Sequence, residues 1–126
     1  MFINFLNKIK NAQSAGKDFL KSAYSNMDMA IAELLVKEGY LEAASKKGRM
    51  PKRVIEVKLK YKDGKGVIGG MKFISRPSLA VTGGYRDFRL VHQGYGVAVV
   101  STPQGIMTVK DARRAKVGGQ ILFEIW

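Results

Sequence analysis

The stretch that decides the fold spans residues 97–125 and reads VAVVSTPQGIMTVKDARRAKVGGQILFEI. Its first residues, 97–100, form a continuous apolar run, which predicts a strand covered on both faces. Thr108 and Asp111 have the spacing of a capping box, so we expect a helix over about 109–116.

The end of this stretch predicts a closing strand. Gly118-Gly119 is expected to end the helix. Apolar side chains then alternate at Ile121, Phe123 and Ile125. The last third of the chain is therefore expected to fold as strand, helix, strand.

Two helices are predicted near the N-terminus. Apolar residues at helical spacing indicate an amphipathic helix over 2–15, and Gly16 suits a left-handed end. Ser25 with Asp28 is a second capping box, and it opens a helix over about 26–38 that Gly39 would cap. The short segment between them, 17–22, is interpreted as a strand.

The middle of the chain reads as a basic loop followed by strands. Residues 45–53 are expected to form the loop. Alternation over 54–61 predicts a half-buried strand, Asp63-Gly64 a tight turn, and 66–74 the returning strand of a hairpin.

After the hairpin, 79–82 is a short strand candidate and 83–95 a loop or single helical turn. The element order is αβαβββ followed by strand, helix, strand. The predicted fold class is α+β.

The excess positive charge lies after residue 45 of the chain. Lys and Arg number 22 against 10 Asp and Glu, a net charge of +12 in 126 residues. Residues 1–45 are neutral, whereas 46–64 and 65–126 carry +6 each. Such an excess favours a polyanionic partner: nucleic acid, an anionic membrane or an acidic protein.

Several chemistries are excluded by composition. The chain has no Cys, which removes disulfides, thiol catalysis and Cys-zinc sites, and its one His rules out a multi-His metal site. No apolar run is long enough to span a membrane. The first residues lack the pattern of a signal peptide, so we expect a cytoplasmic location.

Two features imitate active-site motifs. The glycine-rich stretch 63–70 lacks the Gly-Lys-Ser/Thr and following helix of a phosphate-binding loop, so it is interpreted as a hairpin turn. The sequence has no Gly-x-Ser-x-Gly nucleophile motif for His92 to activate, so we interpret His92 as a structural residue. The sequence therefore predicts no catalytic residue, no metal ligand and no cofactor.

Two segments have the chemistry of an RNA contact. Residues 46–62 hold eight cations and one acid, Glu56, which favours phosphate contact over a merely solvated face. Residues 101–108 offer hydroxyls, an amide and an open backbone at Gly105, ahead of a helix N-terminus. From the residues alone, an ordinary strand-to-helix loop is an equal alternative for 101–108.

At this point the sequence resembles a known family. Residues 94–126 resemble the C-terminal signature of bacterial small-subunit ribosomal protein S8, whose usual core is Ser-Thr-Ser-x-Gly-Val/Ile-Met-Thr, an Ala-Arg helix, Val-Gly-Gly and a strand ending in Trp. Residues 8–12 resemble the family's Arg-Ile-Arg-Asn-Ala, 31–40 its second helix, and 75–77 the Ser-Lys/Arg-Pro turn between its lobes. The third hydroxyl of the signature is replaced by Pro103, and the commoner Lys by Gln104.

The resemblance implies two small packed α+β lobes. An αβαββ lobe would span 1–75, and a mostly β lobe with one short helix and the RNA-binding loop would span 76–126. It also implies a non-enzymatic structural constituent of the small subunit, which binds a helix of the rRNA central domain and supports assembly and translation. An alternative function, added to that role, is repression of translation through its own mRNA.

The implied partners are small-subunit rRNA, neighbouring small-subunit proteins and, for the alternative, the chain's own mRNA, with no membrane and no small-molecule substrate. We expect the rRNA-binding residues to fall into two groups. The loop group is Ser101, Thr102, Pro103, Gln104 and Gly105. The cationic and polar group is Lys8, Lys10, Asn11, Lys52, Arg53 and Arg76.

Two hypotheses from other classes stay open on sequence alone. One is an enzyme acting on a phosphorylated substrate, which would need His92 as its base. The other is a peripheral membrane module, which would need a basic amphipathic helix.

Overall fold

The first helix forms because its apolar side chains recur at helical spacing. In the computed structural model, which describes residues 2–49, 52–74, 81–84 and 96–126, helix α1 spans Phe2–Ser14. Its buried stripe is the predicted one: Phe2, Phe5, Leu6, Ile9 and Ala12. Gly16 follows with φ of +72°, the left-handed end that the sequence indicated.

The second helix begins at the predicted cap. Helix α2 spans Asn26–Lys37, and the Asp28 N–H donates to Ser25 Oγ over 3.2 Å. Gly39 lies just beyond the helix with φ of +87°. Both caps read from the sequence are confirmed.

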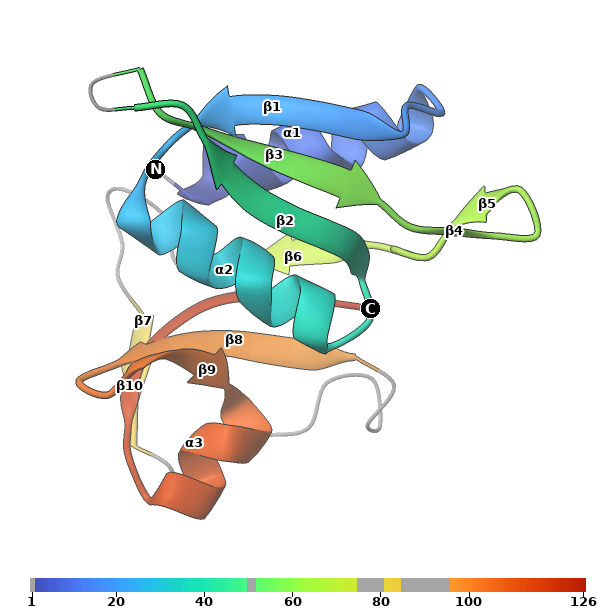
Figure 1. Cartoon of the computed structure of the whole chain (residues 1–126). Helices are drawn as coiled ribbons and strands as arrows, with labels where there is room; N and C mark the ends of the chain where they lie inside the picture. Colours follow the sequence, from blue (N-terminus) through green and yellow to red (C-terminus); the bar gives the residue numbers. More distant parts are fainter. Residues whose placement is uncertain (1, 50–51, 75–80, 85–95) are drawn as a thin grey trace. The chain divides into compact units, whose positions relative to one another are not determined.

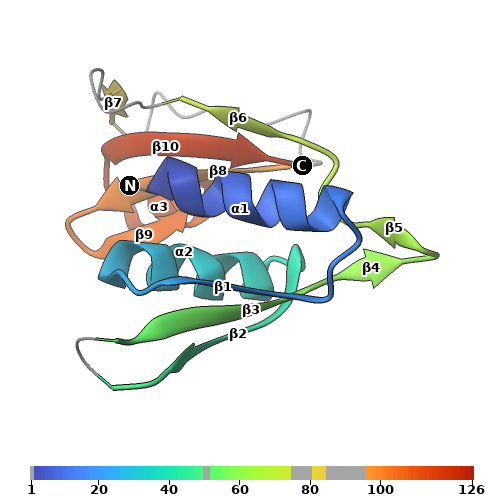
Figure 2. The same cartoon turned by 90° about the horizontal axis from the view of Figure 1, so that it is seen from above.

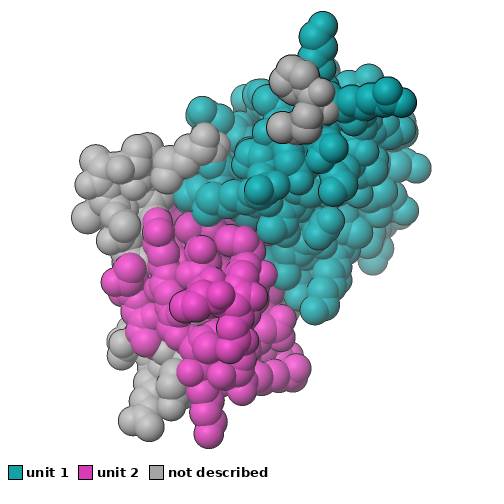
Figure 3. Space-filling view, turned by 60° about the vertical axis from the view of Figure 1, so that its left-hand side comes forward, with its two compact units in different colours: residues 1–67 teal, residues 68–126 magenta. Residues whose placement is uncertain are grey.

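The chain divides into two compact units, residues 1–67 and 68–126 (Figure 3). The sequence analysis put the lobe boundary after residue 75. The difference arises because strand β6 (Met71–Phe73) pairs with β10 (Gly119–Ile125) and so joins the second unit.

The first unit is a three-stranded antiparallel sheet with both helices on one face. The order is β1 (Phe19–Ala23), β3 (Val54–Leu59), β2 (Leu41–Lys47). Figures 1 and 2 both place α1 and α2 on the same side of this sheet. Alternate side chains on β3 (Ile55, Val57 and Leu59) are buried.

Strand β2 was missed by the sequence analysis. Residues 45–47, expected to open a basic loop, are the end of this strand. Within β2 only Leu41 is buried, and the pairing with β3 is irregular between Leu41 and Ala43. A segment without apolar alternation is a strand here because β3 offers its backbone hydrogen bonds.

The hairpin that the sequence predicted over 54–74 is shorter in the structure. Strands β4 (Tyr61–Lys62) and β5 (Lys65–Gly66) form a short hairpin closed by Asp63 and Gly64. The turn prediction is therefore confirmed, but the returning strand ends at Gly66. Residues 71–73 pair instead with residues 123–125 of β10.

The second unit is an antiparallel sheet in the order β6, β10, β8 (Val97–Thr102), β9 (Gly105–Thr108), with β7 (Val81–Gly83) also on β10. The β7 strand overlaps the predicted 79–82. The consecutive residues Ala98, Val99 and Val100 are all buried, as the apolar run predicted. The expected α+β class is confirmed.

Helix α3 (Val109–Ala115) packs on β8. The Thr108 cap is confirmed, since its Oγ1 accepts from the Asp111 N–H over 3.2 Å. Val109 and Ala112 bury against Ala98 and Val100. The helix ends at Lys116, which is itself left-handed with φ of +56°, and not at Gly118-Gly119.

Those two glycines serve strand packing. A Cβ on Gly118 would lie 2.6 Å from the Gly83 carbonyl oxygen of β7. A Cβ on Gly119 would overlap the Ser101 carbonyl oxygen and lie 3.1 Å from the Thr102 Cα. Glycine is needed at both positions because backbone comes too close for any side chain.

The glycine-rich stretch 63–70 holds a turn at one end and the C-terminal residue at the other. Gly69 N–H and Gly70 N–H donate to the Trp126 carbonyl oxygen over 2.6 and 3.1 Å, and Trp126 N–H donates to Gly70. A Cβ on Gly70 would meet the Trp126 ring at 2.7 Å. Gly69 and Gly70 therefore contact the backbone of Trp126, and Gly70 also packs against its indole ring.

Candidate nucleic-acid interface

The segment 101–108 is a β-hairpin and not the strand-to-helix loop that the sequence left open as an alternative. Ser101 pairs with Ile106 and Thr102 with Gly105, which leaves Pro103 and Gln104 as a two-residue turn. A Pro at the first turn position and a Gly just after the turn are the residues that a type I turn favours. That Pro-x-Gly spacing was the signal that could have identified the hairpin.

Thr102 closes this turn from within. Its hydroxyl donates to the Gly105 carbonyl over 2.8 Å and accepts from the Gln104 N–H over 3.2 Å. The side chain is only 9% exposed. The Thr102 hydroxyl is thus engaged in shaping the turn.

The turn itself faces solvent. Pro103, Gln104 and Gly105 are exposed, whereas Ser101 is half-buried. Gly105 has φ of +117°, and no atom lies within 4 Å of where its Cβ would be. The hairpin therefore presents an amide side chain and bare backbone on a fixed frame.

The helix N-terminus expected beside this segment is already capped. Helix α3 begins after β9, and Thr108, which caps its Asp111 N–H, is 3% exposed. The polar groups at the tip are therefore those of the turn.

The cationic predictions that the structure describes lie in the first unit. Lys8, Lys10 and Asn11 are exposed on α1. Lys8 Nζ donates to Ser22 Oγ of β1 over 3.4 Å. Lys8 and Asn11 line an open groove, while Lys10 is not among its lining residues.

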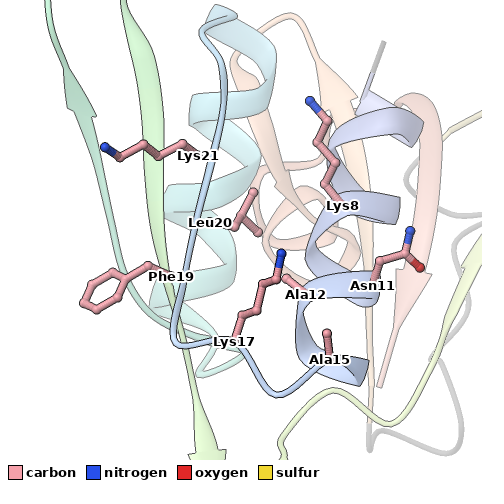
Figure 4. A pocket seen from close by; sticks show the side chains of 8 residues that line it. All are labelled: Lys8, Asn11, Ala12, Ala15, Lys17, Phe19, Leu20 and Lys21. Carbon is pink, nitrogen blue, oxygen red and sulfur yellow. The ribbon is translucent and has the colours of Figure 1, made fainter.

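This groove lies along α1 and β1 and has a volume of about 740 Å³. Figure 4 shows Lys8 and Lys17 extending into the space between the helix and the strand. The groove is lined by Lys8, Asn11, Ala12, Ala15, Lys17, Phe19, Leu20 and Lys21, none of them a carboxylate. Of these, Lys8 and Lys17 extend their charge into the groove, whereas the side chains of Phe19 and Lys21 extend to the other side of β1 (Figure 4). A groove of this charge suits phosphate groups.

The other predicted cations are near the end of β2 and the start of β3. Lys52 is exposed and its N–H donates to the Arg49 carbonyl over 2.8 Å. The Arg53 guanidinium lies 5.4 Å from the Tyr24 ring centre, a cation–π contact. Arg76 and His92 lie outside the described residues.

Sequence reasoning missed Lys17, Lys21 and Phe19, which lie beside the predicted residues. The signal was the alternation of Phe19, Leu20 and Lys21 in a strand, which puts the first and third residues on one face. Among the described residues no group of three or more His, Asp or Glu side chains could hold a metal ion. None of the described helices is long and apolar enough to cross a bilayer.

Comparison with known proteins gives one consistent match. The sequence profile described as Ribosomal protein S8 matches residues 1–126. The chain is 39% identical over 119 residues to small ribosomal subunit protein uS8 of Acidithiobacillus ferrooxidans, covering 94% of this chain and 91% of the relative.

Two further relatives with the same name agree. The protein from Vesicomyosocius okutanii is 39% identical over 123 residues, which cover 98% of this chain and 94% of the relative. The one from Azoarcus sp. is 41% identical over 119 residues, which cover 94% and 91%.

Proposed function

The chain belongs to the ribosomal protein S8 family, and from that premise we propose that its β8–β9 hairpin binds a helix in the central domain of small-subunit rRNA. As a member of this family, the protein is a structural, non-enzymatic component of the small ribosomal subunit, found in the cytoplasm of bacteria. Binding to small-subunit rRNA and a role in translation follow from the family.

The observation that carries the proposal is the clamped turn. Thr102 holds Pro103 and Gln104 in one shape, and Gly105 leaves the backbone open. RNA helices are recognised through shape and through contacts to 2′-hydroxyls, phosphates and accessible bases. A rigid polar tip loses little entropy on fitting such a surface, since its order is already established on folding.

The roles within the hairpin differ. Gln104 and the Gly105 backbone contact RNA, Pro103 stiffens the tip, and Ser101 contacts RNA from the side of the strand. Thr102 acts mainly by holding the turn. In the proposal, phosphate contacts also come from the cationic and polar group of residues: Lys8, Lys10, Asn11, Lys52, Arg53 and Arg76.

The test measures affinity of the full chain for the isolated central-domain rRNA helix. Thr102→Val removes both hydrogen bonds and keeps the side chain's shape, so we expect about tenfold weaker binding. Thr102→Ser keeps the hydroxyl and serves as the matched control. Equal affinity of all three proteins would exclude the hairpin as the contact.

The lysines have a separate readout. Lys10→Gln and Lys52→Gln should each lower the slope of log affinity against log salt by about one. Gln104→Lys should raise it by a similar amount, because it adds a phosphate contact at the tip.

Repression through the chain's own mRNA is a further part of the proposal. It requires an mRNA segment that presents the same RNA shape to the same hairpin. Competition decides it: the leader of the chain's own mRNA should displace the rRNA helix, and Thr102→Val should weaken both complexes alike.

A further inference from the structure

The first unit has a sheet face that neither of its helices covers. Figure 2 shows α1 and α2 on the same side of the sheet of β1, β3 and β2. Since successive side chains along a strand lie on opposite faces, the residues that alternate with the buried ones lie on the other face. We call this surface the outer sheet face. It consists of Phe19, Lys21, Ala23, Ala43, Ser45, Lys47, Val54, Glu56 and Lys58.

Phe19 is the unusual member of this face. Its side chain is 53% exposed, the one large hydrophobic residue so exposed in the described part of the chain. Figure 4 shows Phe19 and Lys21 extending to one side of β1 and Leu20 to the other, toward α1. The ring therefore adds nothing to the core under the sheet.

A single exposed apolar residue is ordinary on protein surfaces, so the neighbours decide its meaning. In the register of the sheet Phe19 is opposite Lys58, and Lys21 is opposite Glu56. Lys58 Nζ lies 5.9 Å from the centre of the Phe19 ring. An accessible aromatic ring is thus bordered by two lysines, one on its own strand and one across from it.

The charge of the face is positive. Its only carboxylate, Glu56, pairs with Lys47 over 3.5 Å. This pair leaves Lys21 and Lys58, the lysines beside Phe19, as the surplus cations of the face. The surface complements a polyanion that also carries flat rings.

Resting on the proposed RNA-binding function, we propose that the outer sheet face binds a single-stranded RNA segment, with an unpaired base stacked on Phe19. Lys21 and Lys58 contact the phosphates on either side of that base. Duplex RNA does not satisfy this surface, because its bases are stacked on each other and their faces are hidden. Stacking on an aromatic platform accepts any base, so the contact is independent of sequence.

The experiment uses two RNAs that share the same central-domain helix. One is blunt and the other carries about six unpaired nucleotides, a length within the span that sheet platforms bind. The full chain should bind the extended RNA about tenfold more tightly than the blunt one. Phe19→Ala should remove this gain and leave the affinity for the blunt helix unchanged.

Matched variants separate stacking from general stickiness. Phe19→Tyr keeps a ring and should keep the gain, whereas Phe19→Leu keeps apolar area without a ring and should lose it. Lys21→Gln should lower the salt slope for the extended RNA by about one and leave the blunt complex unaffected. Since all these side chains point outward, circular dichroism should show unchanged folding.

A direct probe is the tryptophan fluorescence of the Phe19→Trp variant during addition of oligouridine. Its emission should be quenched more than that of the wild type, whose only tryptophan is Trp126. Retention of the gain by Phe19→Ala, or absence of quenching, would overturn the inference. So would a loss of incorporation into reconstituted subunits without any loss of RNA affinity, because a protein neighbour would then occupy the face. If the chain does not bind the blunt helix, the proposed function is contradicted. The oligouridine experiment does not depend on that helix and still tests the outer sheet face.

Discussion

Each unit of this protein contains a hairpin with a two-residue turn, and the two turns are held differently. In the first unit, Asp63 and Gly64 have φ of +54° and +78°, the conformation of a type I′ turn. In the second, Pro103 and Gln104 are bridged by the Thr102 hydroxyl. The first turn follows from local backbone preference, and the second needs a side-chain clamp.

The surroundings of the turns differ as well. No atom lies within 4 Å of a Cβ on Gly64, whereas Gly119 of β10 lies directly against Ser101 and Thr102. The β8–β9 hairpin is thus fixed from behind by a neighbouring strand. The fixed hairpin of the second unit therefore suits recognition of an RNA surface by its shape. The first unit instead presents positive charge and an exposed aromatic ring.

The largest expected effect tests this backing. Gly119→Ala should destabilise the protein by about 3 kcal/mol, because its Cβ would force β10 away from the backbone of β8. Gly64→Ala should cost about 1 kcal/mol, the penalty of a left-handed backbone for a residue with a side chain. Urea unfolding of both variants measures the difference; equal losses would show that β10 does not hold the hairpin.

The second prediction concerns the clamp. Thr102→Val should lower the free energy of unfolding by about 2 kcal/mol, because it leaves the Gly105 carbonyl and the Gln104 N–H without that partner in a part-buried turn. Thr102→Ser should lose less, since the hydroxyl is retained. Chemical denaturation of both variants, with faster amide exchange at Gln104 in the valine variant, checks this expectation.

The third prediction compares the two helix caps. Ser25→Ala and Thr108→Ala should each cost about 1 kcal/mol. The loss should be greater at Thr108, which is 3% exposed and loses a buried methyl group as well. Thermal unfolding of both variants, with Thr108→Ser as control, ranks them; a larger loss at Ser25 would reverse the comparison.

The smallest effect is a pH dependence at the first cap. Burial raises the pKa of Asp28 above its usual 3.8, opposed by the hydrogen bond from Ser25 and the charge of Lys8. Among the described residues its Oδ1 has no hydrogen-bond partner, and the side chain is 8% exposed. A raised folded-state pKa means that the protonated form favours folding, so this contribution is lost as pH rises from near 3.8 through the raised value.

Asp28→Asn should therefore gain stability relative to wild type as pH rises through that window. Denaturation midpoints of both proteins between about pH 3.5 and 7 give the difference curve. A flat curve for Asp28→Asn would show that burial does not dominate at this carboxyl.

The sequence predicted the helices and caps well because those signals are local. Helices α1 and α2 begin and end within one or two residues of the expected positions, and both Ser/Thr-x-x-Asp caps form. The turn at 63–64 was equally readable, since Asp-Gly itself favours it. The family was identifiable as well, because the C-terminal signature combines several such local elements.

The conformation of the candidate segment 101–105 was not predicted from the sequence. Residues 103–105 are exposed as an RNA contact requires, but Thr102 is turned inward by a bond to a carbonyl three residues later. The exposure of Phe19 was also not predicted from the sequence. A lone Phe in a short mixed strand looks like a core residue until the register shows which face it is on.

The sequence by itself determined the helices, the N-terminal caps of α2 and α3, the tight turn and the family, because each depends on residues within about one helical turn of each other. Only the tertiary structure decided that 41–47 is a strand, that 71–73 pairs with β10, and that Gly119 lies against Ser101. These features depend on backbone hydrogen bonds and close approaches between segments far apart in the chain. No local side-chain pattern encodes them, because strand pairing is chosen by the partner that is available.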